Sequence, residues 1–201
     1  MNTDKYLIYV VDDDEAVRDS LAWLLEGIGH RVQVFENAEK FLERCDLNAV
    51  AVLILDIRMP GMTGLELQEV LAAKGSTLPI IFITGHGDVP MAVKAMKLGA
   101  ADFIEKPFNE IVLRDLVSKM LEIAKKNKEE EREKMRNQAL IKKLTDRQRQ
   151  VLERIIAGRL NKQIADDLSI SIKTVESHRA SIMNKLKVNT VAELMRIVLP
   201  K

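Results

Sequence analysis

Five short apolar runs, separated by amphipathic stretches, restrict the fold of the first 124 residues more than any other feature. The runs are continuous rather than alternating, which is typical of strands in a parallel sheet that is covered on both faces. They lie at residues 6–11, 31–35, 49–55, 78–83 and 101–104.

Apolar stripes at helical spacing lie between these runs, at residues 17–28, 89–96 and 113–120. Gly29 ends the first stripe, and Thr63 to Glu66 forms a capping box that starts a helix after the third run. Strand and helix therefore alternate five times with short connections. This alternation predicts a doubly wound α/β domain over residues 1–124.

The character of the chain changes after residue 124. Residues 125–143 are strongly charged and contain neither glycine nor proline, which predicts a helical linker that continues the fifth helix. A second interpretation is that Met135, Ala139 and Leu140 line one side of a helical pair.

Residues 144–201 carry only helical patterns, which predicts an all-α domain of four helices. Capping boxes begin at Thr145 and Thr190, and Gly158 ends the first helix. Two short helices joined by a tight turn at residues 166–171 are typical of a helix-turn-helix.

Charge divides the chain in the same way. Residues 1–124 hold 12 Lys and Arg against 20 Asp and Glu, a net charge of −8, whereas residues 144–201 hold 11 against 6, a net charge of +5. The C-terminal domain is therefore the part expected to meet a polyanion. One cysteine, no secretory signal and no long apolar stretch favour a cytoplasmic protein that does not enter a membrane.

Polar residues follow the apolar runs where an α/β sheet places its functional site, at the carboxyl ends of the strands. Asp12 and Asp13 follow the first run, Asp56 the third, Thr84 the fourth and Lys106 the fifth. Clustered carboxylates suit a hard cation such as Mg²⁺, and one of them can then act as a nucleophile toward phosphorus. A lysine and a hydroxyl can stabilise phosphoryl oxygens.

At these residues the chain resembles the receiver domains of two-component response regulators, which have a flavodoxin-like fold. The resemblance spans residues 5–124 and rests on the motifs VVDDDE, LILDIRMPGMTG, FITGHG and FIEKPF. It implies Asp56 as the phosphoacceptor, a cis Lys106–Pro107 bond, phosphoryl binding by Thr84 and Lys106, and an aromatic switch at Phe103. It also implies an Mg²⁺ site formed by Asp12, Asp13, Asp56 and the backbone carbonyl of Arg58.

Some of these residues also have simpler interpretations. Residues 12–15 suit the N-terminus of the first helix, where acidic side chains are favoured. His86 lies at the rim of the expected pocket, where it either influences the access of water or is an exposed loop histidine. The three histidines lack the spacing of a zinc site.

Residues 144–188 resemble the DNA-binding domain of the LuxR/NarL type. The matching motifs are LTxR, NKxIA, TVxxH and KL, beginning at residues 144, 161, 174 and 185. Leu160 departs from the serine that is usual in the family, which predicts the loss of one contact with a DNA phosphate.

Helical geometry separately indicates the face of residues 172–186 that meets DNA. Val175, His178, Ile182 and Leu186 share one face and should pack inside the domain, so the opposite polar face can enter a major groove. Glu176 suits a cytosine amino group, and Ser177 suits several bases. The predicted DNA-binding residues are Lys162, Lys173, Thr174, Glu176, Ser177, Arg179 and Lys185.

Within the receivers, residues 82–108 are similar to those of the FixJ subgroup. This resemblance implies a transcription activator that a sensor histidine kinase phosphorylates, and that then dimerises through the fourth helix and fifth strand. Promoter DNA is the expected ligand, RNA polymerase is a further candidate partner, and no enzyme with a released product is expected. The alternatives are a constitutive DNA binder, an α/β enzyme, and a C-terminal helical bundle that binds protein.

Overall fold

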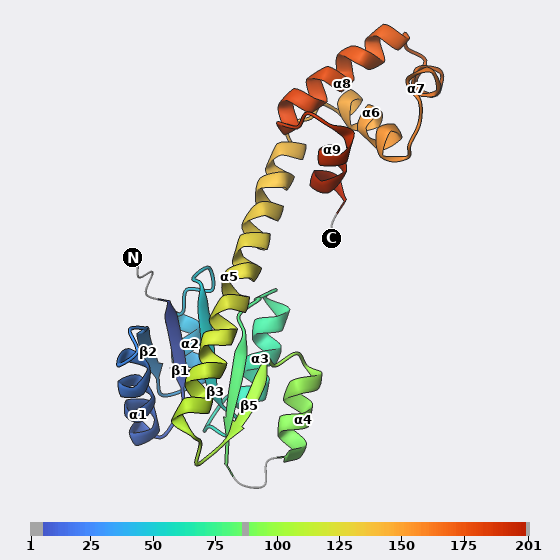
Figure 1. Ribbon diagram of the computed structural model, residues 1–201. Helices are drawn as coiled ribbons and strands as arrows, with labels where there is room; N and C mark the ends of the chain where they lie inside the picture. The colour runs from blue at the N-terminus through green and yellow to red at the C-terminus, as the bar shows by residue number, and fades with distance from the viewer. Residues whose placement is uncertain (1–5, 86–88, 200–201) are drawn as a thin grey trace. The chain divides into compact units, whose positions relative to one another are not determined.

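The computed structural model describes residues 6–85 and 89–199 and divides the chain into two compact units, Met1–Glu129 and Glu130–Lys201 (Figure 1). The first unit contains a sheet covered by helices, and the second is helical. Buried apolar clusters lie within each unit, so each has its own hydrophobic core.

The sheet of the first unit is parallel, with the strand order β2-β1-β3-β4-β5. This order reverses direction between β1 and β3, as in doubly wound flavodoxin-like domains, so the predicted fold class is confirmed. The strands are β1 (Leu7–Val11), β2 (Arg31–Phe35), β3 (Ala51–Asp56), β4 (Ile80–Thr84) and β5 (Asp102–Glu105).

Helices cover both faces of this sheet. The helices are α1 (Glu15–Glu26), α2 (Ala38–Arg44), α3 (Gly64–Ala73), α4 (Val89–Lys97) and α5 (Glu110–Ile141). Residues of α1 and α5 pack on one face, and residues of α2, α3 and α4 on the other. Successive side chains of β3 therefore enter different cores: Leu53 joins the first and Ile54 the second. This burial on both sides explains the continuous apolar run.

The two edge strands depart from the expected burial on both faces. Among the described residues, β1, β3 and β4 have a strand on each side, whereas β2 and β5 form the edges. Val34 of β2 and Phe103 of β5 are accordingly exposed. An edge strand has one neighbour and less helical cover, so an apolar side chain there can face solvent.

The helix α5 continues without interruption from the first unit into the second. It runs from Glu110 to Ile141, so the segment 125–141 is helical, as the sequence predicts for a linker that extends the fifth helix. Its early turns contribute Leu113 and Val117 to the core of the first unit. Near its end, Leu140 belongs to the core of the second unit.

Up to residue 199, where the described part of the chain ends, the second unit adds four helices that pack around one core. The helices are α6 (Asp146–Ile156), α7 (Asn161–Leu168), α8 (Ile172–Leu186) and α9 (Val191–Val198). Hydroxyl side chains at Thr145, Ser171 and Thr190 cap α6, α8 and α9 by accepting backbone N–H bonds. Ser169 ends α7 in the left-handed region, with φ of 52°, and turns the chain toward α8. The turn between α7 and α8 is therefore three residues long.

Candidate functional site

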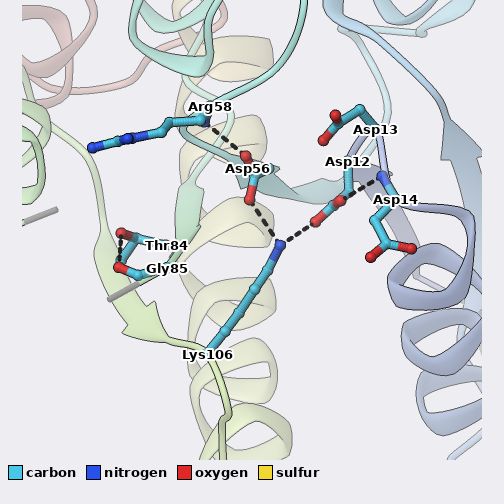
Figure 2. A pocket seen from close by; sticks show the side chains of 8 residues that line it. All are labelled: Asp12, Asp13, Asp14, Asp56, Arg58, Thr84, Gly85 and Lys106. Carbon is cyan, nitrogen blue, oxygen red and sulfur yellow. Dashed lines mark hydrogen bonds and ion pairs between the residues drawn. The ribbon is translucent and has the colours of Figure 1, made fainter. Parts of the chain in front are cut away.

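A polar pocket lies at the carboxyl ends of the strands in the first unit (Figure 2). Asp12 follows β1, Asp56 ends β3, Thr84 ends β4 and Lys106 follows β5. Parallel pairing thus brings together four side chains that are far apart in sequence. The pocket has a volume of about 420 Å³ and is lined by Asp12, Asp13, Asp14, Asp56, Arg58, Thr84, Gly85 and Lys106.

The ammonium group of Lys106 bridges the two buried carboxylates of this pocket. Its Nζ lies 2.7 Å from Oδ2 of Asp12 and 2.8 Å from Oδ1 of Asp56, as Figure 2 shows. Asp56 is only 7% exposed and Asp12 only 1%. Because a buried charge must be paired to be tolerated, one cation here stabilises two anions.

Burial and pairing act in opposite directions on the pKa values of the pair. Burial raises the pKa of Asp56, and its contacts with Lys106 reverse only part of that rise. Burial alone lowers the pKa of Lys106, but its hydrogen bonds and ion pairs with Asp12 and Asp56 together raise it above its ordinary value. Lys106 therefore stays protonated, while Asp56 is a stronger base than an exposed aspartate.

Backbone and arginine contacts hold the remaining oxygens of these aspartates. The backbone N–H of Asp14 donates to Oδ1 of Asp12 over 2.9 Å, and the backbone N–H of Arg58 donates to Oδ2 of Asp56 over 2.7 Å. The guanidinium of Arg18, on α1, donates to the backbone carbonyl of Asp12 over 2.7 Å. Arg18 was not singled out from the sequence, because nothing there shows that its side chain reaches back to the end of β1.

The donor atoms of the predicted metal site are all oxygens, which suits Mg²⁺. Asp12 is buried, whereas Asp13 is exposed beside it at the pocket. Over residues 6–85 and 89–199, however, no group of three or more His, Cys, Asp or Glu side chains is arranged to hold a metal ion. The chemistry of the donors thus fits, while Lys106 occupies the position between Asp12 and Asp56.

The other residues predicted for this site are also located. Thr84 is buried, and its hydroxyl donates to the carbonyl of Gly85 over 3.1 Å. Phe103 is 42% exposed, so its ring lies outward on the edge strand. The Lys106–Pro107 peptide bond is cis, as the resemblance to receiver domains implies. His86 lies outside the described residues.

The second unit presents a polar face on α8. The predicted inner residues Val175, Ile182 and Leu186 are buried, and His178 is half-buried beside them. The opposite side of α8 is exposed at Lys173, Ser177, Ala180 and Asn184, Glu176 is exposed at the side of the helix, and Lys162 is exposed on α7. A helix with one packed face and one polar face can enter a major groove.

Three of the predicted DNA-binding residues are less exposed to solvent. Thr174 and Arg179 are half-buried, and the hydroxyl of Thr174 lies 2.8 Å from that of Ser171. Lys185 is half-buried too, and its ammonium donates to two oxygens of its own unit. Leu160, by contrast, is 70% exposed at the start of α7 and makes no side-chain cap.

Both units match known protein families. Residues 8–118 match the response regulator receiver domain, and residues 142–198 match the bacterial regulatory proteins of the luxR family. The chain is 46% identical over 197 residues to the response regulator protein TmoT of Ectopseudomonas mendocina, covering 98% of this chain and 90% of that protein. It is 42% identical to the transcriptional regulatory protein FixJ of Bradyrhizobium diazoefficiens, covering 98% and 96%.

Solved structures show the same likeness over nearly the full length. The response regulator StyR has a TM-score of 0.84 at 44% identity and covers 96% of this chain and 98% of its own. Full-length FixJ from B. japonicum has a TM-score of 0.59 at 41% identity and covers 97% and 96%. The chain belongs to the response regulators that join a receiver domain to a luxR-type DNA-binding domain.

This membership makes the chain a transcriptional regulator of a two-component system. A receiver domain implies a histidine kinase as a partner, and the luxR-type domain implies DNA as a ligand. In the described part of the chain, no helix is both long enough and apolar enough to span a bilayer.

Proposed function

We propose that a partner histidine kinase phosphorylates Asp56, and that this phosphorylation controls binding of the C-terminal domain to promoter DNA. The observation that carries the proposal is the convergence of Asp12, Asp56, Thr84 and Lys106 in one pocket. An oxygen of Asp56 attacks the phosphorus of the phosphohistidine. A P–O bond forms, the P–N bond breaks, and the imidazole nitrogen that leaves takes up a proton.

The residues around Asp56 have separate roles in this step. Asp12, Asp13, Asp56 and the backbone carbonyl of Arg58 would hold Mg²⁺, which would supply positive charge next to the phosphoryl group. The hydroxyl of Thr84 and the ammonium of Lys106 bind the phosphoryl group. Lys106 already lies 2.8 Å from Asp56, so its charge is in place before the phosphate arrives.

The phosphorylated receivers dimerise through α4 and β5. Thr84 ends β4, and Phe103 lies on the neighbouring strand β5, so a shift of Thr84 toward the phosphate gives the ring of Phe103 room to turn inward. The surface of α4 and β5 exposes Val93, Met96 and Phe103, which supports a second copy as the occupant.

Residues 1–124 act as the receiver, residues 125–143 as a helical linker and residues 144–201 as the DNA-binding domain, in the cytoplasm. Two such domains engage paired half-sites near a promoter, where RNA polymerase is a candidate further partner of an activator. The chain releases no product of its own, because its chemistry is confined to its own aspartate. The proposed DNA contacts are Lys162, Lys173, Thr174, Glu176, Ser177 and Arg179.

DNA binding and the mass of the complex, measured with and without acetyl phosphate across a salt series, test this proposal. We expect acetyl phosphate to raise the affinity and to give two chains per duplex. The Asp56→Asn chain should show neither effect. An Asp56→Asn chain that still gained affinity would contradict the role of Asp56, and a chain without acid-labile phosphate would favour a constitutive DNA binder.

A further inference from the structure

We infer that Gln148 is a positioning residue that fixes the orientation of the DNA-contacting helix α8. We further infer that Lys185 hydrogen-bonds to Gln148 inside the domain instead of binding a DNA phosphate. The inference rests on the proposed DNA-binding function of α8. It assigns a role to Gln148 and changes the role that the sequence predicts for Lys185.

Gln148 uses both ends of its amide to hold other elements. It is only 7% exposed and lies in the first turn of α6. Its Nε2 donates to the hydroxyl of Ser181 over 2.8 Å, and its Oε1 accepts from Nζ of Lys185 over 2.8 Å. The same Oε1 accepts from the backbone N–H of Thr145 over 3.1 Å as part of the capping box. One side chain thus joins the start of α6 to two residues of α8.

Ser181 and Lys185 are four residues apart and lie on the same side of α8, one turn from each other. This side adjoins the buried row that contains Ile182 and Leu186. Apolar packing alone resists sliding weakly, because side chains of similar shape can repack. Directional bonds at two successive turns fix both the rotation of α8 about its axis and its position along that axis.

The ammonium of Lys185 makes its hydrogen bonds within the second unit. Besides Oε1 of Gln148, it donates to the backbone carbonyl of Lys143 over 3.1 Å. Both of these partners are neutral oxygens, so the hold depends on hydrogen-bond geometry and not on an ion pair. A lysine that contacted a phosphate would have to give up these two bonds.

The preceding residue holds the other helix of the helix-turn-helix. A guanidinium nitrogen of Arg147 donates to the carbonyl of Leu168, the last residue of α7. Two successive side chains of α6 therefore hold α7 and α8 separately. This arrangement supports a positioning role for the start of α6, since the turn between α7 and α8 lies between the two held points.

Binding to two duplexes by the full-length chain tests the inference. One duplex is selected by the unmodified chain from a randomised pool of about 20 base pairs, and the other has the same composition in scrambled order. Gln148→Ala should weaken binding to the selected duplex about tenfold and binding to the scrambled duplex by much less. Gln148→Glu keeps Oε1 as the acceptor for Lys185 and replaces the Nε2 donor with an oxygen to which the Ser181 hydroxyl can donate, so it should keep most of the discrimination. Ser181→Ala removes one bond only and should give a smaller loss.

The salt dependence of binding separates the two roles of Lys185. Each lysine that contacts a phosphate contributes about one to the slope of log affinity against log salt concentration. Lys173→Gln, at the exposed face of α8, should lower the slope by about one on both duplexes. Lys185→Gln should leave the slope unchanged and reduce discrimination, as Gln148→Ala does. A slope lowered by about one in Lys185→Gln would overturn the inference.

Hydrogen exchange of residues 176–188 without DNA gives a separate measurement. Gln148→Ala should speed exchange in α8, and Gln138→Ala, at an exposed position of α5, should not. Unchanged exchange in Gln148→Ala would overturn the inference, as would faster exchange with unchanged discrimination. If the unmodified chain prefers no sequence in the pool, the proposed function fails instead, and exchange still decides whether Gln148 holds α8.

Discussion

Lys106 connects two carboxylates that would otherwise repel each other inside the pocket. Its ammonium lies within 2.8 Å of oxygens of both Asp12 and Asp56. The two aspartates need this cation because both are almost fully buried. A metal ion must compete with this ammonium for the carboxylate oxygens, whereas incoming phosphoryl oxygens must compete with the carboxylates for the ammonium. The group that holds the resting pocket together is therefore the one that must change partners during the reaction.

Replacing Asp56 with asparagine should stabilise the fold at neutral pH. Burial raises the folded-state pKa of Asp56, so the folded chain binds its proton more tightly than the unfolded chain does. Below the unfolded pKa of about 4 both states are protonated and no penalty exists; as the pH rises through the folded pKa, the ionised aspartate costs stability. The asparagine side chain of the variant ionises in neither state.

Urea unfolding of both chains from about pH 4 to pH 7 measures this difference. The advantage of Asp56→Asn should be absent at the acid end and grow with pH. Asp19→Asn, on the exposed side of α1, is the control and should show no such trend. An advantage that shrinks as the pH rises would mean that the bonds to Lys106 outweigh burial.

Removing the ammonium of Lys106 should destabilise the fold and should increase the stabilisation that Mg²⁺ provides. In Lys106→Met, Asp12 and Asp56 lose their shared cation, and we expect the free energy of unfolding to fall by about 2 kcal/mol without metal. Mg²⁺ at about 10 mM should restore more stability to this variant than to the unmodified chain, because metal and ammonium compete for the same oxygens.

Thermal unfolding with Mg²⁺ and with a chelator checks this expectation, and Lys97→Met is a matched control on the exposed side of α4. An equal gain from Mg²⁺ in all three chains would show that the metal does not bind next to Lys106. A gain that survives in Asp13→Asn would exclude Asp13 as a ligand.

At the scale of elements, the buried strands could be predicted from the sequence. Short or exposed elements could be predicted less well. β3 is buried along its whole length, so its apolar run is unambiguous. The helix α2 has no predicted stripe of its own, because its seven residues bury only Ala38 and Phe41. The exposure of β2 and β5 depends on which strands form the edges, and strand order is a property of the whole sheet.

The candidate sites show the same division. Residues of the pocket could be found because they follow strands whose ends must meet. The ion pairs among these residues could not be predicted from the sequence. A flexible side chain such as Lys106 has many rotamers, and only the packed structure selects the one that lies between Asp12 and Asp56. Likewise, the sequence shows Gln148 as part of a helix cap, but its contact with Ser181 spans 33 residues.

The junction between β3 and α3 depends on a glycine. A Cβ at Gly64 would lie 2.2 Å from the backbone carbonyl oxygen of Asp56, a contact that side chains do not make. Gly64→Ala must therefore displace either the backbone at Asp56 or the start of α3, and we expect Asp56 to move. We expect the free energy of unfolding to fall by about 3 kcal/mol and phosphorylation by acetyl phosphate to slow.

Gly27→Ala provides the comparison, since a Cβ there lies 3.2 Å from the carbonyl of Trp23 and φ is −60°. Its effect should stay within about 1 kcal/mol. Urea unfolding and the rate of phosphate incorporation measure both variants. Normal phosphorylation in a destabilised Gly64→Ala chain would show that the backbone shift moves into α3 and spares Asp56.

At the scale of the whole molecule, one continuous helix contributes to the buried clusters of both units. In the sequence, the buried apolar residues of the sheet unit come before residue 130 and those of the helical unit come after it, while α5 includes this position. Segments with many charges and few apolar contacts gain their helicity mainly from their own backbone bonds. The middle of α5 is such a segment, and a single substitution there can therefore interrupt the helix.

Glu133→Pro tests whether this continuity transmits the signal. Glu133 is exposed in α5, and proline there removes a backbone bond and breaks or kinks the helix at a cost of about 3 kcal/mol. We expect phosphorylation of Asp56 and the basal affinity for DNA to remain as they are, because each unit keeps its core. The increase in affinity on phosphorylation should fall toward none.

Glu133→Ala keeps the helix and removes the same carboxylate, so it should behave like the unmodified chain. Phosphate incorporation and DNA titration with and without acetyl phosphate separate the steps in all three chains. If Glu133→Pro keeps the full increase, a rigid α5 is not required, and joining two chains through their receivers would raise DNA affinity by effective concentration alone. If it loses the increase while still forming dimers, the orientation of the DNA-binding domains must pass through the helix.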